Sequence, residues 1–283
     1  MLVTLNEVLK EARKEHYAVP AFDINDDLLI RTILDTAEEK KSPVILMALE
    51  HDLEGKGMNY ITSIVKGVAD NYDIPIVLHL DHSVHFDVVK SAIENGFTSV
   101  MYDGSVLPYE ENVARMQKVV EFAKNKGVTV EGELGHVAGK DIDGSSQGET
   151  FLTEPEDVIR FVDATHVDAL AVSIGTAHGI YTSTPNLKID RLKKINKVST
   201  VPLVLHGGSG TPVDQVQNAI RNGITKVNLY ADLRISMFEG MKKAVASQKR
   251  ADPLPDELFE EARTSIRNTV LKKIEMTMSE NRA

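Results

Sequence analysis

Short apolar runs rich in β-branched residues alternate along the chain with stretches in which apolar residues recur at helical spacing. The apolar runs, which have the length of buried strands, lie at residues 18–22, 43–48, 76–80, 98–102, 128–134, 168–174, 201–206 and 226–230. The stretches with helical periodicity include residues 28–40, 60–72, 112–126, 158–165 and 213–223. A strand followed by a helix, eight times over, predicts an α/β fold of the (β/α)8 TIM-barrel type.

Glycine marks the end of several predicted helices. The segments ENGFTSV, NKGVTV and RNGITKV place Gly96, Gly127 and Gly223 a few residues before the next apolar run, as in a left-handed helix C-cap. An open, doubly wound sheet is the alternative fold, but eight units without a dinucleotide-binding fingerprint favour the barrel.

One domain is expected to include all residues, 1–283, because α/β barrels of this length form a single unit. The tail, residues 252–283, is predicted to form two helices after a proline-containing lead-in. We expect this C-terminal extension to pack across one end of the barrel or against a partner subunit.

Composition and charge narrow the classes of partner and of chemistry. No apolar run is long enough to span a bilayer and the first residues lack signal-peptide features, so a cytoplasmic location is expected. The net charge of −10 argues against nucleic acid and membrane partners. Because cysteine is absent, a metal ion would need His, Asp or Glu ligands.

Polar residues occur where the predicted strands end, which is where barrel enzymes place their reactive groups. These residues are Asp81, His82, Asp103, Glu131, Glu133, His178, His206 and Asn228. His82, His178 and His206 could supply the three ligands of a catalytic zinc and leave a fourth position open, with Asp81 as the acid or base beside them.

Each histidine also has an ordinary explanation as a helix-capping or hydrogen-bonded surface residue. This explanation is preferred for the histidines away from the strand ends, which are His16, His51, His85, His136 and His166. His79 shares a strand face with Asp81 and is expected to be an interior histidine with a satisfied hydrogen bond.

A glycine-rich segment, LVLHGGSGTPVDQV, follows the seventh predicted strand. Gly207, Gly208 and Gly210 precede the start of a helix, and free amides at such a turn attract phosphate. Barrel enzymes often bind phosphate on the loops after strands seven and eight. A lysine Schiff base is the chemical alternative to a metal, but Lys226 begins the eighth strand and is expected at the wrong end of the barrel.

Six motifs occur in order along nearly the whole chain: LHLDHS, MYDGSVLPYEENV, VEGELGHVAG, AVSIGTAHGIY, PLVLHGGSG and TKVNL. Together they resemble the class II, zinc-dependent ketose-bisphosphate aldolases, which include the fructose- and tagatose-bisphosphate enzymes. The resemblance implies a lyase of carbohydrate metabolism, such as glycolysis, that reversibly cleaves a phosphorylated ketose to dihydroxyacetone phosphate and an aldehyde. It also implies a homodimer or homotetramer.

The resemblance further implies a role for individual residues. It makes His82, His178 and His206 the zinc ligands and Asp81 the group that moves a proton on the C4 hydroxyl. Other matched positions are two acids near the metal (Asp103, Glu133), a loop acid that exchanges the proton on the donor carbon (Asp141), a phosphate-binding set (Gly179, Gly207, Ser209) and a contact to the enediolate (Asn228). A monovalent cation such as Na⁺ or K⁺ often assists at the phosphate.

Several substrate-contact positions depart from the family pattern. Leu49 stands where relatives commonly have serine, and Asp23 where many have asparagine. Tyr230 and Ala231 replace a segment whose hydroxyl helps to bind the donor phosphate.

The tail also lacks an arginine that often follows Asp-Pro in the family, and the candidate replacements are Arg234, Arg250 and Arg263. These departures favour tagatose 1,6-bisphosphate, a ketose 1-phosphate or a related sugar-acid phosphate over fructose 1,6-bisphosphate. Two other classes stay open, namely a metal-dependent barrel epimerase or isomerase acting on sugars and a non-catalytic sugar-phosphate binder.

Overall fold

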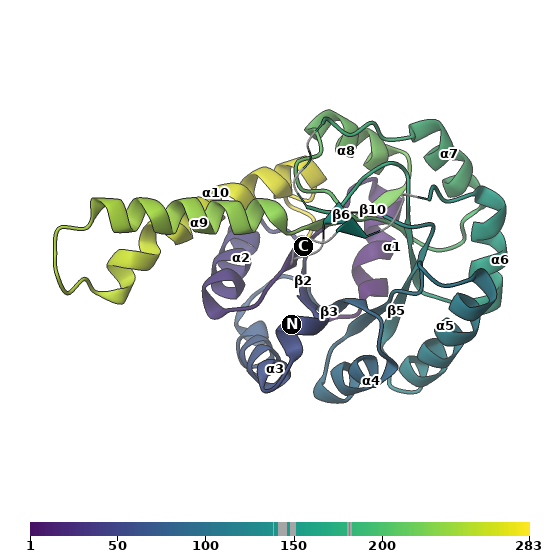
Figure 1. Cartoon of the computed structure of the whole chain (residues 1–283), viewed down its shortest axis with the longest axis horizontal. Helices are drawn as coiled ribbons and strands as arrows, with labels where there is room; N and C mark the ends of the chain where they lie inside the picture. Colours follow the sequence, from purple (N-terminus) through teal and green to yellow (C-terminus); the bar gives the residue numbers. More distant parts are fainter. Residues whose placement is uncertain (138, 141–145, 148–150, 180, 182) are drawn as a thin grey trace.

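The computed structural model describes residues 1–137, 139–140, 146–147, 151–179, 181 and 183–283. Eight parallel strands close into a barrel in the order β1-β10-β9-β8-β5-β4-β3-β2, with helices around it (Figure 1), which confirms the (β/α)8 prediction. The barrel strands are β1 (Val19–Asp23), β2 (Val44–Leu49), β3 (Ile76–Ser83), β4 (Ser99–Tyr102), β5 (Thr129–Leu134), β8 (Ala169–Val172), β9 (Leu203–Leu205) and β10 (Ile224–Leu229).

The helices follow the strands in the predicted alternation. They are α1 (Leu5–Glu15), α2 (Asp27–Glu39), α3 (Gly57–Val68), α4 (Phe86–Asn95), α5 (Tyr109–Lys124), α6 (Pro155–Thr165), α7 (Ile189–Val198), α8 (Val213–Arg221), α9 (Ala231–Ser247) and α10 (Pro255–Thr277), with short 3₁₀ turns η1 (Glu50–Leu53) and η2 (Ala69–Asn71). Gly96 follows α4 with a φ of +99°, as predicted for a C-cap glycine. Among the described segments, no helix has both the length and the apolar character needed to cross a membrane.

The floor of the barrel interior is apolar and is closed by α1. Inward-facing residues of several strands form one cluster there: Val19, Ala21, Ile45, Met47, Val77, Ala169, Ala171 and Val204. Leu5, Leu9 and Ala12 of α1 recur at helical spacing and pack into the same cluster. The Leu5 amide donates a 3.2 Å hydrogen bond to the Thr129 hydroxyl at the start of β5. Polar groups are therefore left to the opposite end, where the strands finish.

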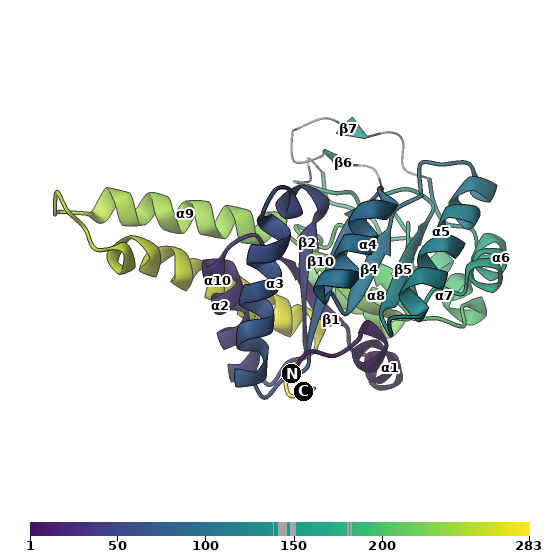
Figure 2. The ribbon, with the colours of Figure 1, turned by 90° about the horizontal axis from the view of Figure 1, so that it is seen from below.

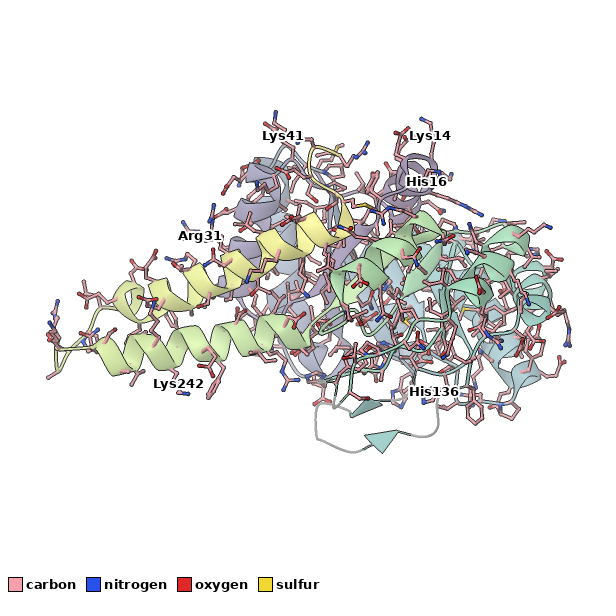
Figure 3. All side chains as sticks on the ribbon, turned by 90° about the horizontal axis from the view of Figure 1, so that it is seen from above. Lys14, His16, Arg31, Lys41, His136 and Lys242 are labelled. Atoms are coloured by element: carbon pink, nitrogen blue, oxygen red, sulfur yellow. The ribbon has the colours of Figure 1, made fainter. Side chains whose placement is uncertain are left out.

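The two ends of the barrel are separated along its axis. In Figure 2, α1 and both chain termini lie at one end, and the short antiparallel pair β6 (Gly139–Lys140) and β7 (Ser146–Gln147) lies beyond the other. Figure 3 shows the same separation through its labelled side chains, with Lys14 and His16 at the α1 end and His136 near β6 and β7. We call the end where the strands finish the mouth of the barrel.

The prediction of two helices in the tail was wrong. Residues 255–277 form the single helix α10, which packs along α9 and against α2. The segment after Pro255 contains neither Gly nor Pro, so no backbone signal interrupts the helix. α9 and α10 form a hairpin that projects from the side of the barrel rather than across one of its ends (Figure 1).

Candidate active site

The strand β3 brings two adjacent residues, Asp81 and His82, to the same mouth. Alternation along a regular strand would turn neighbouring side chains to opposite faces. Here the pairing of β3 with β4 shifts register between Leu80 and Ser83, and His82 has a φ of +46°. Such an irregularity re-aims a side chain. It lets Asp81 follow the inward face of the strand while the His82 ring also turns inward.

The three predicted histidines lie together at the mouth. The ring centroids of His82 and His206 are 4.5 Å apart, those of His82 and His178 are 4.8 Å apart, and those of His178 and His206 are 5.8 Å apart. His206 Nδ1 lies 2.7 Å from His82 Nε2. The structure thus brings together side chains from β3, from the loop after β8 and from the end of β9.

Carboxylates hold the outward-facing nitrogens of two of these rings. His82 Nδ1 donates to Asp103 Oδ2 at 2.9 Å, and His206 Nε2 donates to Glu131 Oε1 at 2.9 Å. This leaves Nε2 of His82 and Nδ1 of His206 directed toward each other. A carboxylate behind a ligand histidine is typical of metal sites, where it fixes the tautomer and the ring orientation.

Two further atoms fit a metal ion in this place. His178 Nε2 and Glu133 Oε2 are buried and have no hydrogen-bond partner among the described residues. Glu133 Oε2 lies 3.7 Å from His206 Nδ1. Potential ligand atoms of His82, His178 and His206, and separately of His82, Asp103 and Glu133, lie within 4.8 Å of one another. Imidazole and carboxylate donors that otherwise lack partners match what a divalent metal such as zinc requires.

The electrostatics of the mouth favour positive charge. Burial alone would lower the pKa of His82, but Asp81, Asp103 and Glu133 outweigh burial and raise it to about 10. Burial, with a smaller contribution from Asp103, raises the pKa of Glu133 well above its ordinary value. Burial and the charge on His82 lower the pKa of His178 to about 3. A cation placed among these groups would relieve the repulsion among the carboxylates.

Asp81 is buried and held by the predicted substrate-contact residue Asn228. Asn228 Nδ2 donates to both carboxylate oxygens of Asp81 at 3.2 Å, and Asp81 Oδ2 lies 3.9 Å from His82 Nε2. Burial would raise the pKa of Asp81, but the positive charges of His82 and Lys226 hold it well below its ordinary value. Asp81 is therefore an ionised acceptor beside the histidines.

The glycine-rich loop after β9 lies next to these residues and joins the loop after β10. Gly207 has a φ of +68°, and a Cβ there would collide with the Ala177 carbonyl. The Gly208 amide donates to the Asn228 carbonyl at 3.0 Å, so that amide is already engaged. The Ser209 hydroxyl accepts from the amides of Tyr230 and Asp232 at 3.1 and 3.3 Å.

Of the remaining predicted positions, Gly179 directly follows His178 with a φ of +86°. Asp141 lies outside the described residues. The candidate arginines separate: Arg234 lies over the Tyr230 ring, 5.3 Å from its centre, whereas Arg250 pairs with Asp252 and Arg263 with Glu260 on the α9–α10 hairpin. Arg234 is thus the candidate that contacts Tyr230, the residue directly after β10.

A charged layer beneath the mouth was not predicted. Lys226 was expected at the wrong end of the barrel, yet its Nζ lies 2.7 Å from Glu131 Oε2, immediately below His206. The alternation of side chains along a strand indicates the inward direction of Lys226, because Lys226 precedes Asn228 by two residues and must share its inward face. His79 is a fully buried histidine bonded to Ser99 Oγ at 2.8 Å, as predicted.

Two surface clefts, of about 440 and 770 Å³, lie at the α1 end and share Asn6 and Asp168. The histidines and buried carboxylates converge at the opposite end of the barrel. We place the candidate site with those groups, because chemistry requires convergent reactive side chains rather than volume alone.

Comparison with known proteins shows the family to which this chain is similar. The family model for class-II fructose-bisphosphate aldolase matches residues 3–282. The crystal structure of the YdjI aldolase from Escherichia coli K12 is 29% identical, with 100% of both chains covered and a TM-score of 0.89. A putative fructose-1,6-biphosphate aldolase from Coccidioides immitis is 28% identical over 98% of this chain and 97% of that chain, with a TM-score of 0.89. The fructose-bisphosphate aldolase (Fba) from Campylobacter jejuni is 21% identical over 100% and 97% of the two chains, with a TM-score of 0.83, and supports the fold alone.

Proposed function

The chain belongs to the class-II fructose-bisphosphate aldolase family, and from this premise we propose that it is a zinc-dependent aldolase that cleaves a phosphorylated ketose reversibly to dihydroxyacetone phosphate and an aldehyde. Membership makes it a lyase, and it implies a phosphorylated sugar as substrate and a metal as cofactor. The observation that best supports the specific proposal is the meeting of His82, His178 and His206 beside the buried Asp81.

His82, His178 and His206 would hold the zinc ion through the ring nitrogens that face the centre of the cluster. Lewis-acid polarisation of the ketose carbonyl is the chemistry that zinc supplies when bound. Asp103 orients His82 through its 2.9 Å contact. Glu133 provides a further carboxylate close to His206, as support or as part of an alternative metal position.

Asp81 would take the proton of the C4 hydroxyl as the bond between C3 and C4 breaks, and would return it in the condensation direction. Its geometry suits this role, because the Asn228 amide fixes both carboxylate oxygens. Asn228 Oδ1 is buried and has no partner in the described part of the chain. It is thus available to accept from a hydroxyl of the enediolate half of the substrate. We assign proton exchange on the donor carbon to Asp141 from its place in the loop motif.

The donor phosphate would bind at the loop formed by Gly179, Gly207, Gly208 and Ser209, with a monovalent cation such as Na⁺ or K⁺ nearby. Ser209 is suited to this because a hydroxyl can accept and donate at once. Its oxygen accepts from two amides at the start of α9, so its own proton stays available for a phosphate oxygen. The backbone approach at Gly207 leaves no room for a side chain.

The residues beside β1 and β10 favour an aldehyde half without a second phosphate. Asp23 is 3% exposed, and its Oδ1 has no hydrogen-bond partner among the residues described. Burial raises the pKa of Tyr230 to about 12, and Asp23 and Asp52 add to the shift. Burial raises the pKa of Asp23 well above its ordinary value, and the charge on Asp81 adds to the shift, so this position disfavours negative charge. A phosphate here would meet the same desolvation and the same repulsion from Asp81, whereas a hydroxyl group can form a hydrogen bond with Asp23. We therefore favour a ketose 1-phosphate over a bisphosphate.

The projecting hairpin supports a homodimer or homotetramer, with a second copy of the chain as its partner. It exposes large apolar side chains from both helices, including Phe238 (64% exposed), Val245 (69%) and Phe259 (40%). Large apolar side chains exposed on a projecting element are typical of association surfaces.

The test of function is release of dihydroxyacetone phosphate, coupled to NADH oxidation, from a panel of ketose 1-phosphates and 1,6-bisphosphates. We expect release from at least one ketose 1-phosphate with zinc, and loss of release with EDTA. A folded, zinc-loaded protein that is silent across the panel would overturn the proposal. Analysis of carbon number in the products separates cleavage from epimerisation or isomerisation, which keep the carbon chain intact.

A further inference from the structure

A charged layer lies one step below the mouth of the barrel. Lys226, Glu131 and His79 come from β10, β5 and β3, and all three are 0% exposed. Lys226 Nζ lies 2.7 Å from Glu131 Oε2 and 3.3 Å from His79 Nε2. Each residue precedes a mouth residue of its own strand by two positions, so the layer is directly beneath Asn228, Glu133 and Asp81.

Stability alone does not account for these buried charges. Removing an ammonium and a carboxylate from water is costly, and well-packed apolar residues in their place are often equally stable or more stable. The barrel already has an apolar floor immediately below this layer. The pair is therefore expected to serve the groups above it.

Glu131 connects the ammonium to a proposed metal ligand. Its Oε2 accepts from Lys226, and its Oε1 accepts from His206 Nε2 at 2.9 Å. An ionised carboxylate can only accept hydrogen bonds, so His206 must carry its proton on Nε2 and present an unprotonated Nδ1 toward His82.

The same ammonium also fixes the residue behind Asp81. Lys226 has donors and no acceptor, so His79 Nε2 must accept from it and His79 Nδ1 must donate to Ser99 Oγ, 2.8 Å away. His79 Nε2 lies 3.7 Å from Asp81 Oδ1. Lys226 thus stands behind both a proposed metal ligand and the proposed proton acceptor.

We propose that Lys226 is a positioning residue: its bond to Oε2 of Glu131 holds Oε1 against Nε2 of His206, so that His206 presents Nδ1 to the metal and the site binds zinc tightly. This inference rests on the proposed metal site, but not on the identity of the substrate. Lys226 acts on the metal site through Glu131 and His206, and it does not contact the substrate.

The direct test is the tautomer of His206 in the metal-free protein, read from ¹⁵N-histidine NMR with His206→Gln as the assignment control. We expect a proton on Nε2 of His206. An Nδ1-protonated His206 in the unsubstituted protein would overturn the inference without any question of whether a variant folds.

The second test is zinc affinity in the double variant Lys226→Met/Glu131→Gln, measured by competition with a chromophoric chelator in the absence of substrate. Removal of both charges avoids leaving one of them unpaired in the interior. A glutamine amide can also donate to Nε2 of His206 and so no longer specifies the tautomer. We expect zinc affinity to fall roughly 10–100-fold, as for other residues behind metal ligands. Thermal unfolding of the metal-free variant should be close to that of the original protein.

The matched control is Arg267→Met/Glu39→Gln, which removes an exposed ion pair of 2.7 Å between α10 and α2. Its zinc affinity should be unchanged. A folded Lys226→Met/Glu131→Gln variant with the original zinc affinity would mean that the buried pair is structural only, and the inference would fail while the proposed function stands. If the unsubstituted protein itself bound no zinc, the proposed function would fail first and the inference with it. If the double variant does not fold, the tautomer of His206 in the unsubstituted protein decides the matter.

Discussion

Asp81→Asn is the substitution that most directly tests the proposed proton acceptor, because it removes the charge and keeps the shape of the side chain. Asp81 is 3% exposed and receives Asn228 Nδ2 at 3.2 Å on both oxygens. The amide oxygen of the variant can still accept one of these hydrogen bonds. The fold around the mouth should therefore persist, so that a loss of turnover can be attributed to lost basicity.

The expected magnitude follows from the role. A positioned general base contributes roughly 10²–10⁴-fold to rate, which corresponds to about 3–5 kcal/mol at about 1.36 kcal/mol per tenfold change. Asp81 Oδ2 lies 3.9 Å from His82 Nε2, so the carboxylate also attracts a cation held by that histidine. Zinc affinity should weaken to a lesser degree, and the comparison of rates must be made at saturating zinc.

The assay is kcat for ketose cleavage with coupled detection of dihydroxyacetone phosphate, together with zinc content of the same preparation. Asp35→Asn is the matched control, because it makes the same chemical change on α2, where Asp35 accepts from the Tyr72 hydroxyl at 2.7 Å, and it should leave kcat unaltered. Near-original turnover of a zinc-saturated Asp81→Asn variant would refute the assignment of Asp81 as the proton acceptor.

Three further substitutions address the metal, the specificity and the hairpin. His82→Ala should lose zinc and turnover together, because it removes a proposed ligand and the 2.9 Å partner of Asp103; full zinc content after dialysis would contradict this. Asp23→Asn replaces a buried carboxyl with an amide that can donate to a phosphate oxygen. It should therefore raise kcat/KM for a 1,6-bisphosphate relative to the 1-phosphate by about tenfold, equivalent to about 1.4 kcal/mol, and an unchanged ratio would exclude Asp23 from specificity. Gly240→Val should destabilise the protein by roughly 1–3 kcal/mol, because a Cβ there would lie 2.5 Å from Ala262 Cα. The urea midpoint of unfolding should therefore fall, and light scattering should show a lower molar mass if the hairpin joins subunits. An unchanged urea midpoint would contradict the close packing of the two helices.

The barrel could be predicted because its strands are buried on both faces and therefore read as continuous apolar runs. The tail could not be divided correctly by the same method. Two helices were predicted after residue 252, whereas the second helix of the hairpin is the unbroken α10 and the first is α9, which begins at Ala231 directly after β10. The close approach of Gly240 to Ala262 that joins them depends on tertiary packing and leaves no local pattern.

The mouth residues could be predicted from their positions at strand ends, but their orientations could not. Alternation predicts that only one of Asp81 and His82 faces inward, and the register shift between Leu80 and Ser83 that turns both inward has no signature in composition. Lys226 was misjudged for the opposite reason. Its position at the start of the strand predicts the α1 end of the barrel, whereas the alternation of side chains predicts an inward direction. An inward ammonium requires a buried partner, which Glu131 supplies.

The irregular backbone at His82 and the inward-facing Lys226 belong to one connected set of contacts. The left-handed backbone of His82, with a φ of +46°, is of a kind that costs on the order of 1–3 kcal/mol and persists only where the surroundings fix it. Asp103 and His206 contact the two nitrogens of the His82 ring, Glu131 fixes His206, and Lys226 fixes Glu131. This line of contacts sets the direction of both ring nitrogens before any metal binds, and a metal site depends on ligands that are held in place in advance. The buried ion pair therefore has its physical explanation in the geometry of the histidines above it rather than in the stability of the barrel.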